Sequence, residues 1–248
     1  MKTRKKKYIL FAALILILLS ALTVCFFQFT HCGYLMTLPC RAAFTEIDEH
    51  VFINKNTSID KDEVLAVIGQ AKERDEAFFG DLHFTDDTYF IFCDDEKLIG
   101  KIGADHETVM PSIMLKKQYI CISDKYLDLD ILAHEITHAE LHTRLSRKAL
   151  KKVPTWFDEG LATQNDYREN YSEEQWAKQT DNGKNTVAPE DMDTPQEFYA
   201  GEKEDRRFRY LNAKHEVAVW MKAHGQQGLS ELIKKLNEGA DFDTAYAE

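Results

Sequence analysis

The chain has 248 residues, of which 44% are apolar and 29% are charged. That is enough chain for one hydrophobic core of normal size and too little for three domains. The net charge is −11, but five Lys and Arg residues lie within the first seven positions and leave 26 basic against 42 acidic residues beyond them, a net charge of −16. A body this acidic repels nucleic acid, so we expect no nucleic-acid partner.

The N-terminal segment is strongly apolar. No Asp, Glu, Lys or Arg occurs between Lys7 and Arg41, and residues 8–27 consist almost wholly of Leu, Ile, Ala, Val and Phe. Such a stretch is long enough to span a bilayer, and the preceding cations favour a cytoplasmic N-terminus. We therefore expect a basic cytoplasmic tail at 1–7, a single transmembrane anchor at 8–29, and a periplasmic or extracellular body beyond it.

Two alternatives to an uncleaved anchor stay open. A cleaved signal peptide would have a shorter apolar region followed by a small-x-small site, and no good site of that kind follows this one. The run Leu22-Thr23-Val24-Cys25 resembles a lipoprotein cleavage box, but Val24 is a poor residue immediately before the cysteine.

The chain has five cysteines, which could form disulfides or remain free thiols. One of them, Cys25, lies in the apolar segment, and the other four form an even set that allows three disulfide pairings. Cys93 and Cys121 end or occupy strand-like runs and could meet on neighbouring strands, which would leave Cys32 with Cys40. Buried free thiols are the equal alternative.

The sequence of the first half predicts both strands and a helix. We expect an irregular juxtamembrane segment at 30–50 and the folded domain at 51–248, which begins with a short strand at 51–53. Apolar spacing and a closing Gly80 predict a helix over 60–79, with Ser58 as its N-cap. Two β-rich runs follow, at 88–93 and 118–122, around a stretch that contains Gly100, Gly103 and Pro111.

The second half predicts helices. The expected long helices cover 131–151, 155–165 and 210–223, the last ended by Gly225, and two short helices cover 229–236 and 242–246. Residues 166–207 are polar and poorly patterned, which predicts a long loop region that rims a site.

The most informative motif lies in the predicted helix 131–151 and reads His134-Glu135-Ile136-Thr137-His138. Each residue of an α-helix turns about 100°, so His134, Glu135 and His138 project within one arc, with the two imidazoles one turn apart. Both rings can then bind one ion. Neutral imidazole suits Zn²⁺, and Glu135 lies close enough to a zinc-bound water to accept its proton.

A second motif supplies a third ligand. A catalytic zinc needs three protein ligands and an open position, and two adjacent turns of one helix cannot surround a tetrahedral ion. The downstream segment reads Pro154-Thr155-Trp156-Phe157-Asp158-Glu159-Gly160-Leu161-Ala162. Glu159 can complete the site from a helix that Pro154 helps to start, with Trp156 and Phe157 available to pack that helix against the first.

These two motifs together resemble those of the gluzincin metallopeptidases, in which HExxH is followed by a Trp-x-x-Glu-Gly-x-Ala segment. The resemblance covers residues 118–165 and implies an α+β, zincin-like fold with a small β-rich N-terminal part and a mostly helical C-terminal part. It also implies that Glu159 is the third zinc ligand and Glu135 the general base. No exopeptidase motif of the Gly-x-Met-x-Asn kind occurs between Phe92 and Gln118, which favours an endopeptidase.

Further side chains are candidates for the same site. The family often takes an oxyanion donor from a Tyr at the start of a helix, which points to Tyr210, with His215 as an alternative donor and simple packing as the alternative role for Tyr210. His142 is a weaker candidate ligand, because it lies one further turn along the helix. Asp158 and Thr163 are candidate partners of the ligand histidines.

The expected function is therefore a membrane-anchored, zinc-dependent peptidase that hydrolyses peptide bonds of a peptide or protein substrate on the exported side of the membrane. The alternative is a catalytically silent binding or adaptor module that keeps the same fold. An intact Glu135 favours the enzyme, because replacing that residue is the simplest way to lose catalysis.

Overall fold

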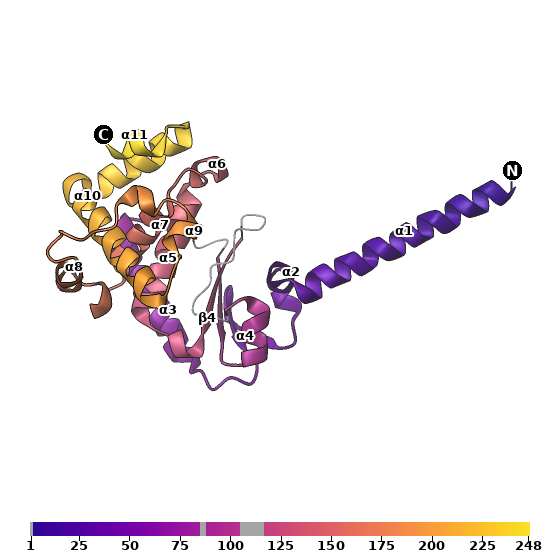
Figure 1. Ribbon diagram of the computed structural model, residues 1–248. Helices are drawn as coiled ribbons and strands as arrows, with labels where there is room; N and C mark the ends of the chain where they lie inside the picture. The colour runs from indigo at the N-terminus through magenta and orange to yellow at the C-terminus, as the bar shows by residue number, and fades with distance from the viewer. Residues whose placement is uncertain (1, 85–87, 105–116) are drawn as a thin grey trace. The chain divides into compact units, whose positions relative to one another are not determined.

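The computed structural model describes residues 2–84, 88–104 and 117–248 (Figure 1). The described chain is mixed α/β, with a small sheet in its N-terminal half and helices throughout its C-terminal half. It divides into two compact units, one made of Met1–Ile59 with Tyr89–Tyr126 and the other of Asp60–Thr88 with Leu127–Glu248. Pro111, expected to punctuate the stretch between two strands, lies outside the described residues.

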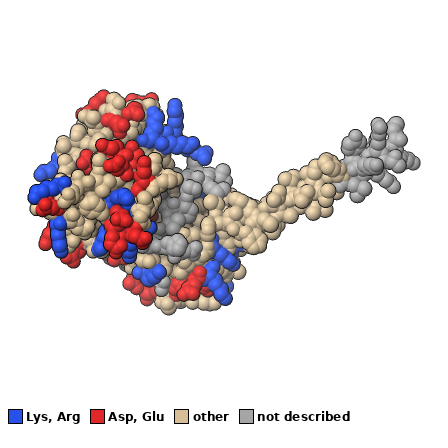
Figure 2. Space-filling view, viewed as in Figure 1, with Lys and Arg blue, Asp and Glu red and all other residues tan. Residues whose placement is uncertain are grey.

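The N-terminal helix α1 (Lys2–Phe29) is long and apolar enough to cross a membrane, over Phe11–Phe29. Its side chains from Phe11 to Val24 are exposed in the isolated chain. Figure 2 shows no Lys, Arg, Asp or Glu on this helix over Phe11–Phe29. An exposed apolar surface of this length needs an apolar environment, which agrees with the expected span.

The segment that follows α1 is regular, and the prediction of an irregular juxtamembrane segment at 30–50 was wrong. It contains α2 (His31–Met36), the 3₁₀ turn η1 (Leu38–Cys40) and the first strand, β1 (Phe44–Asp48). The Thr30 hydroxyl caps α2 by accepting a hydrogen bond from the backbone N–H of Gly33. Elements this short carry too few residues to show a clear apolar period, which explains why the sequence did not reveal them.

A four-stranded sheet has the strand order β1-β2-β3-β4, so β4 is at an edge of the described sheet. Its further strands are β2 (Val51–Asn54), β3 (Thr88–Cys93) and β4 (Gln118–Ser123), which confirms the three predicted strands. β1 pairs antiparallel with β2, and β2 pairs parallel with β3, with Val51 opposite Phe90. Every residue of β3 and β4 is buried.

The core of this first unit is formed by α2, α4 (Glu96–Ile102) and the inner side chains of the strands. Cys93 and Cys121 belong to it and are fully buried. All five cysteines are free, so the structure contains neither the Cys93–Cys121 nor the Cys32–Cys40 pairing. Of the four cysteines beyond the apolar segment, only Cys93 and Cys121 are buried thiols, whereas Cys40 is exposed.

The second unit is helical. Its longer helices are α3 (Lys61–Phe79), α5 (Leu129–Arg144), α7 (Thr155–Ala162) and α10 (Lys203–Glu238), which pack in the order α3, α5, α7, α10. Its shorter helices are α6 (Arg147–Leu150), α8 (Glu173–Gln179), α9 (Pro195–Phe198) and α11 (Phe242–Tyr246). The polar region 166–207 therefore contains helices as well as loops.

Several predicted helix boundaries were wrong. The N-cap of α3 is Asp60, whose carboxylate accepts from the N–H groups of Asp62 and Glu63, and Ser58 instead donates to Asp94. The expected helix 131–151 is broken at Leu145, which is extended, and at Ser146, which caps α6.

Two further helices differ from the ranges that the sequence predicts. The helix expected over 155–165 ends at Ala162 and tightens into the 3₁₀ turn η4 (Thr163–Asn165). The helix expected over 210–223 begins earlier, at Lys203. Its predicted break at Gly225 is confirmed, because the φ of 63° and ψ of −167° at this residue are not helical and separate two helical stretches within α10.

The core of this unit places α7 directly against α10. The rings of Trp156 and Phe157 contact Phe242 and Tyr246 of α11, so they pack α7 on the C-terminal helices. At Gly160 a Cβ would lie 2.5 Å from the carbonyl oxygen of Ala213, which is closer than atoms can approach. Only glycine therefore allows the two backbones to meet here.

Candidate metal centre

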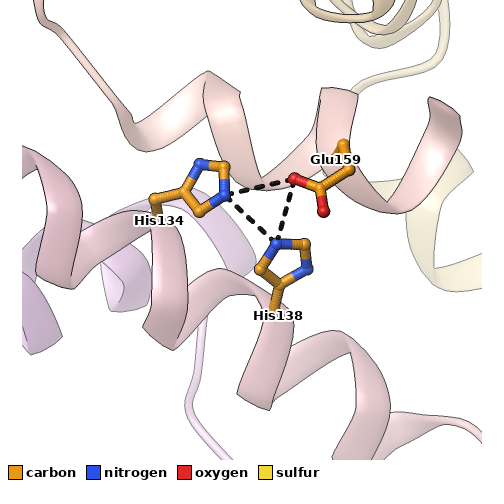
Figure 3. A group of neighbouring side chains, drawn as sticks. All are labelled: His134, His138 and Glu159. Atoms are coloured by element: carbon orange, nitrogen blue, oxygen red, sulfur yellow. Dashed lines mark hydrogen bonds and ion pairs between the residues drawn. The ribbon is translucent and has the colours of Figure 1, made fainter. Parts of the chain in front are cut away.

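Three predicted ligands come together in the helical unit. His134 and His138 project from α5, and Glu159 projects from α7 toward both rings (Figure 3). The Nε2 atoms of the two histidines lie 3.1 Å apart, and each lies 3.4 Å from Oε2 of Glu159. All three residues are buried. This group could hold a metal ion.

The donor set and its spacing fit one small cation. With bonds of about 2.0–2.1 Å, the ligand atoms of a tetrahedral zinc lie about 3.3–3.4 Å apart, close to the three separations in this cluster. Oε2 of Glu159 is buried and accepts no hydrogen bond from the described residues. A buried carboxylate oxygen without a donor is costly, and a bound cation would satisfy it.

The charges of the cluster are strongly coupled. Burial alone would lower the pKa of His138, but the carboxylates of Asp158 and Glu159 outweigh it and hold that pKa well above its ordinary value. Burial alone would raise the pKa of Glu159, but the close imidazoles of His138 and His134 hold it well below its ordinary range. The carboxylate is thus ionised at neutral pH, as a metal ligand must be.

Asp158 contacts one ligand histidine, as expected. Its Oδ1 accepts a 2.7 Å hydrogen bond from Nδ1 of His138, and its Oδ2 accepts a 2.7 Å hydrogen bond from Nε2 of His142. Burial would raise the pKa of Asp158, but the two imidazoles hold it far below its ordinary range. His142, the weaker candidate ligand, therefore contacts Asp158 and does not belong to the group formed by His134, His138 and Glu159.

Tyr199 reaches the cluster and was missed by the sequence analysis. It follows α9 in the polar region, and its hydroxyl donates a short hydrogen bond to Oε1 of Glu159. Burial of the hydroxyl and the charge of Glu159 raise the pKa of Tyr199 far above its ordinary value. The only signal in the sequence is the aromatic pair Phe198-Tyr199 within an otherwise polar stretch.

Tyr210 also lies beside the cluster, but within α10 rather than at its start. Its ring centre is 6.2 Å from that of His134 and 4.9 Å from that of Phe198, so the ring both borders the site and packs on the core. Burial, followed by the charge of Glu159, raises the pKa of Tyr210 well above its ordinary value. Its hydroxyl lies within hydrogen-bonding reach of Tyr199.

Two other candidates have contacts elsewhere. The ring of His215 stacks on Trp176 with 3.4 Å between ring centres, and its Nδ1 lies 2.9 Å from Oε2 of Glu173. Thr163 donates its hydroxyl to the backbone carbonyl of Glu159 and so supports the ligand's helix rather than a histidine.

Buried polar contacts hold α5 in place behind the ligands. Asp75 of α3 accepts hydrogen bonds from the Thr137 hydroxyl at 2.6 Å and from the Asn165 side-chain amide at 2.9 Å. Burial raises the pKa of Asp75 to about 8, although these two hydrogen bonds lower it. The network joins α3, α5 and η4 at the residue before His138.

Glu135 is buried next to His134 on α5. Its carboxylate is close enough to Tyr210 for its charge to raise the pKa of that phenol. One part of the helical unit therefore brings together the carboxylates of Glu135 and Glu159, the imidazoles of His134 and His138, and the phenols of Tyr199 and Tyr210.

In comparisons with protein-family profiles and with curated proteins, the sequence has no significant match.

Proposed function

We propose that the protein is a zinc-dependent peptidase, most similar in its site to the gluzincins and of a zincin-like fold, anchored by α1 with its body on the exported side of the membrane. The observation that carries the proposal is the spacing of the three ligand atoms from α5 and α7, which matches that around one tetrahedral ion. With three protein ligands, the fourth position of such an ion would be free for water. The two helices and the order of their motifs are those that the resemblance requires.

The metal would be held by Nε2 of His134, Nε2 of His138 and Oε2 of Glu159. When bound, zinc lowers the pKa of a water molecule and polarises the scissile carbonyl. Glu135 takes the proton from the attacking water and passes it to the nitrogen of the departing amine. The Tyr210 hydroxyl donates a hydrogen bond to the carbonyl oxygen as negative charge develops there.

The decisive variant is Glu135→Gln in the full-length protein, purified in detergent micelles. The amide keeps the size of the side chain but cannot accept the proton, so hydrolysis of an unfolded protein substrate should fall by about 10²-fold or more. Bound zinc, measured by elemental analysis, should stay at one ion per chain. Glu76→Gln, an exposed change on α3, is the matched control and should keep both properties.

Two results would contradict the proposal. Activity of Glu135→Gln within tenfold of the parent would show that another group is the base. Zinc binding by a parent protein that hydrolyses no peptide bond would favour the silent binding module instead.

A further inference from the structure

Asp158 lies between two histidines of α5. The histidines are one helical turn apart, and α7 places the carboxylate so that each of its oxygens accepts from a different ring, both at 2.7 Å. Asp158 and both rings are largely buried. One ring, that of His138, belongs to the proposed metal centre, and the other, that of His142, does not.

These three residues are all of types that ligate metals, and their atoms are close enough to form a second candidate group. The distances between ligand atoms distinguish this group from the proposed metal centre of His134, His138 and Glu159. Ligand atoms around a tetrahedral zinc lie about 3.3–3.4 Å apart, whereas separations of 2.7 Å are those of charge-assisted hydrogen bonds. Asp158 is therefore an acceptor for two ring N–H groups.

The hydrogen bond from His138 determines which of its nitrogens can bind metal. An ionised carboxylate can only accept, so Nδ1 of His138 carries the proton. When the ring loses its other proton to bind metal, its lone pair is on Nε2, the atom that faces Glu159. Asp158 preserves this arrangement only while its own carboxylate is held, because rotation of the carboxylate would carry Oδ1 away from His138.

We propose that His142 is a positioning residue that fixes the carboxylate of Asp158 and, through it, the ring of His138 for metal binding. His142 opposes rotation of the carboxylate by donating to the second oxygen. This role depends on the metal site of the proposed function but not on peptide hydrolysis, so an inactive protein that binds zinc would still show it.

The test measures metal binding directly. Full-length protein in detergent micelles is stripped of metal and titrated with Zn²⁺ against a chelator, which gives the stoichiometry and the dissociation constant. The visible absorption of the Co²⁺-loaded protein reports the coordination geometry. Circular dichroism shows that each variant is folded.

The variants at His142 distinguish the effect of losing its hydrogen bond from the effect of losing the volume of its ring. His142→Leu removes the donor and keeps an apolar side chain, and His142→Ala removes the donor where leucine does not fit. His142→Gln keeps an N–H group near the place of Nε2. His83→Leu removes the ring of an exposed His–Asp pair, in which His83 lies 2.9 Å from Asp81, and is the matched control.

We expect His142→Leu, or His142→Ala in its place, to bind one zinc about tenfold more weakly and to alter the Co²⁺ spectrum. Loss of a group that orients a ligand typically weakens metal binding by about 10–100-fold. We expect the lower end of this range because His142 acts on the ligand His138 indirectly, through Asp158. His142→Gln should restore the affinity to within about threefold of the parent. His83→Leu should match the parent in both measurements.

Three results would overturn the assignment. Parent-like affinity and an unchanged spectrum in both His142→Leu and His142→Ala would show that His142 positions nothing. A second zinc in the parent that is lost in these variants would make His142 a ligand of its own ion. A parent protein that binds no zinc would refute the metal site and this role together, whereas zinc binding without peptidase activity would refute only the proposed function.

Discussion

The Tyr199 hydroxyl donates a hydrogen bond to Oε1 of Glu159, while Oε2 of the same carboxylate faces the nitrogens of His134 and His138. The two oxygens of one ligand thus have different partners. A carboxylate held in this way would offer a single oxygen to an ion, so Tyr199 would fix the mode in which Glu159 binds metal.

Tyr199→Phe should therefore weaken zinc binding by about tenfold, because the carboxylate becomes free to rotate. The folded structure should persist, since the residue is 42% exposed. Competition titration with a chelator measures the change. Tyr167→Phe, at a tyrosine that is 64% exposed, is the matched control. Equal affinities for Tyr199→Phe and the parent would show that the hydroxyl does not constrain the ligand.

Glu159→Ala should leave the protein without stoichiometric zinc, because two histidines alone make a weak site. Elemental analysis after gel filtration measures the metal content. Glu174→Ala, an exposed change on α8, should retain one zinc per chain. If Glu159→Ala kept its zinc and His142→Ala lost it, the third ligand would be misassigned.

Tyr210→Phe tests the oxyanion donor. If the hydroxyl donates to the developing charge, its loss should lower kcat by about 10²-fold with little change in KM, because the bond strengthens mainly in the transition state. Tyr246→Phe, at a tyrosine of α11 that packs on Trp156 and Phe157, should keep kcat. A parent-like kcat in Tyr210→Phe, with a large fall in His215→Ala, would transfer the role to His215.

Asp75 should make stability depend on pH. Its pKa is raised from 3.8 to about 8 in the folded protein, so between these values the unfolded chain loses a proton that the folded chain keeps. The stabilising contribution of Asp75 is complete below pH 4 and is lost as the pH rises toward 8, with a slope of at most about 1.4 kcal/mol per pH unit.

The comparison of the parent with Asp75→Asn isolates this effect, because the amide accepts the same hydrogen bonds from Thr137 and Asn165 without titrating. Denaturant midpoints of the metal-free proteins between pH 5 and 8 should fall more steeply for the parent. The nearby charges of Arg74 and Glu140 are common to both proteins. Parallel slopes would show that Asp75 is ionised in the folded protein.

A reporter enzyme fused after Glu248 should be active only on the exported side of the membrane, because five N-terminal cations favour a cytoplasmic start of α1. The mature chain should also retain its first methionine. A soluble mature chain that begins between residues 23 and 34 would show a cleaved signal peptide instead.

The sequence predicted the grouping of His134, His138 and Glu159 because much of its geometry is local. The HExxH spacing places His134 and His138 on one face of α5 whatever surrounds the helix. Glu159 could be added because a second short motif marks it. The structure brings these three side chains together, as the resemblance based on the two motifs implied.

Tyr199 and Asp75 could not be predicted in the same way. Tyr199 reaches Glu159 across 40 residues of chain, and Asp75 contacts Thr137 across 62, so both contacts depend on tertiary packing. The break at Leu145 was missed because an apolar residue continues the helical period. Ser146, a good N-cap, was the local signal for a new helix.

The close approach of Gly160 to α10 makes one position of α7 intolerant of any side chain. The carbonyl oxygen of Ala213 and the Cγ2 atom of Val217 lie 2.5 and 2.8 Å from where a Cβ at residue 160 would be. Because residue 160 directly follows Glu159, a larger residue there would push α7 away from α10 and move the carboxylate relative to the two histidines. A single methyl group at a residue with no polar side chain would therefore be enough to disturb the candidate ligand group.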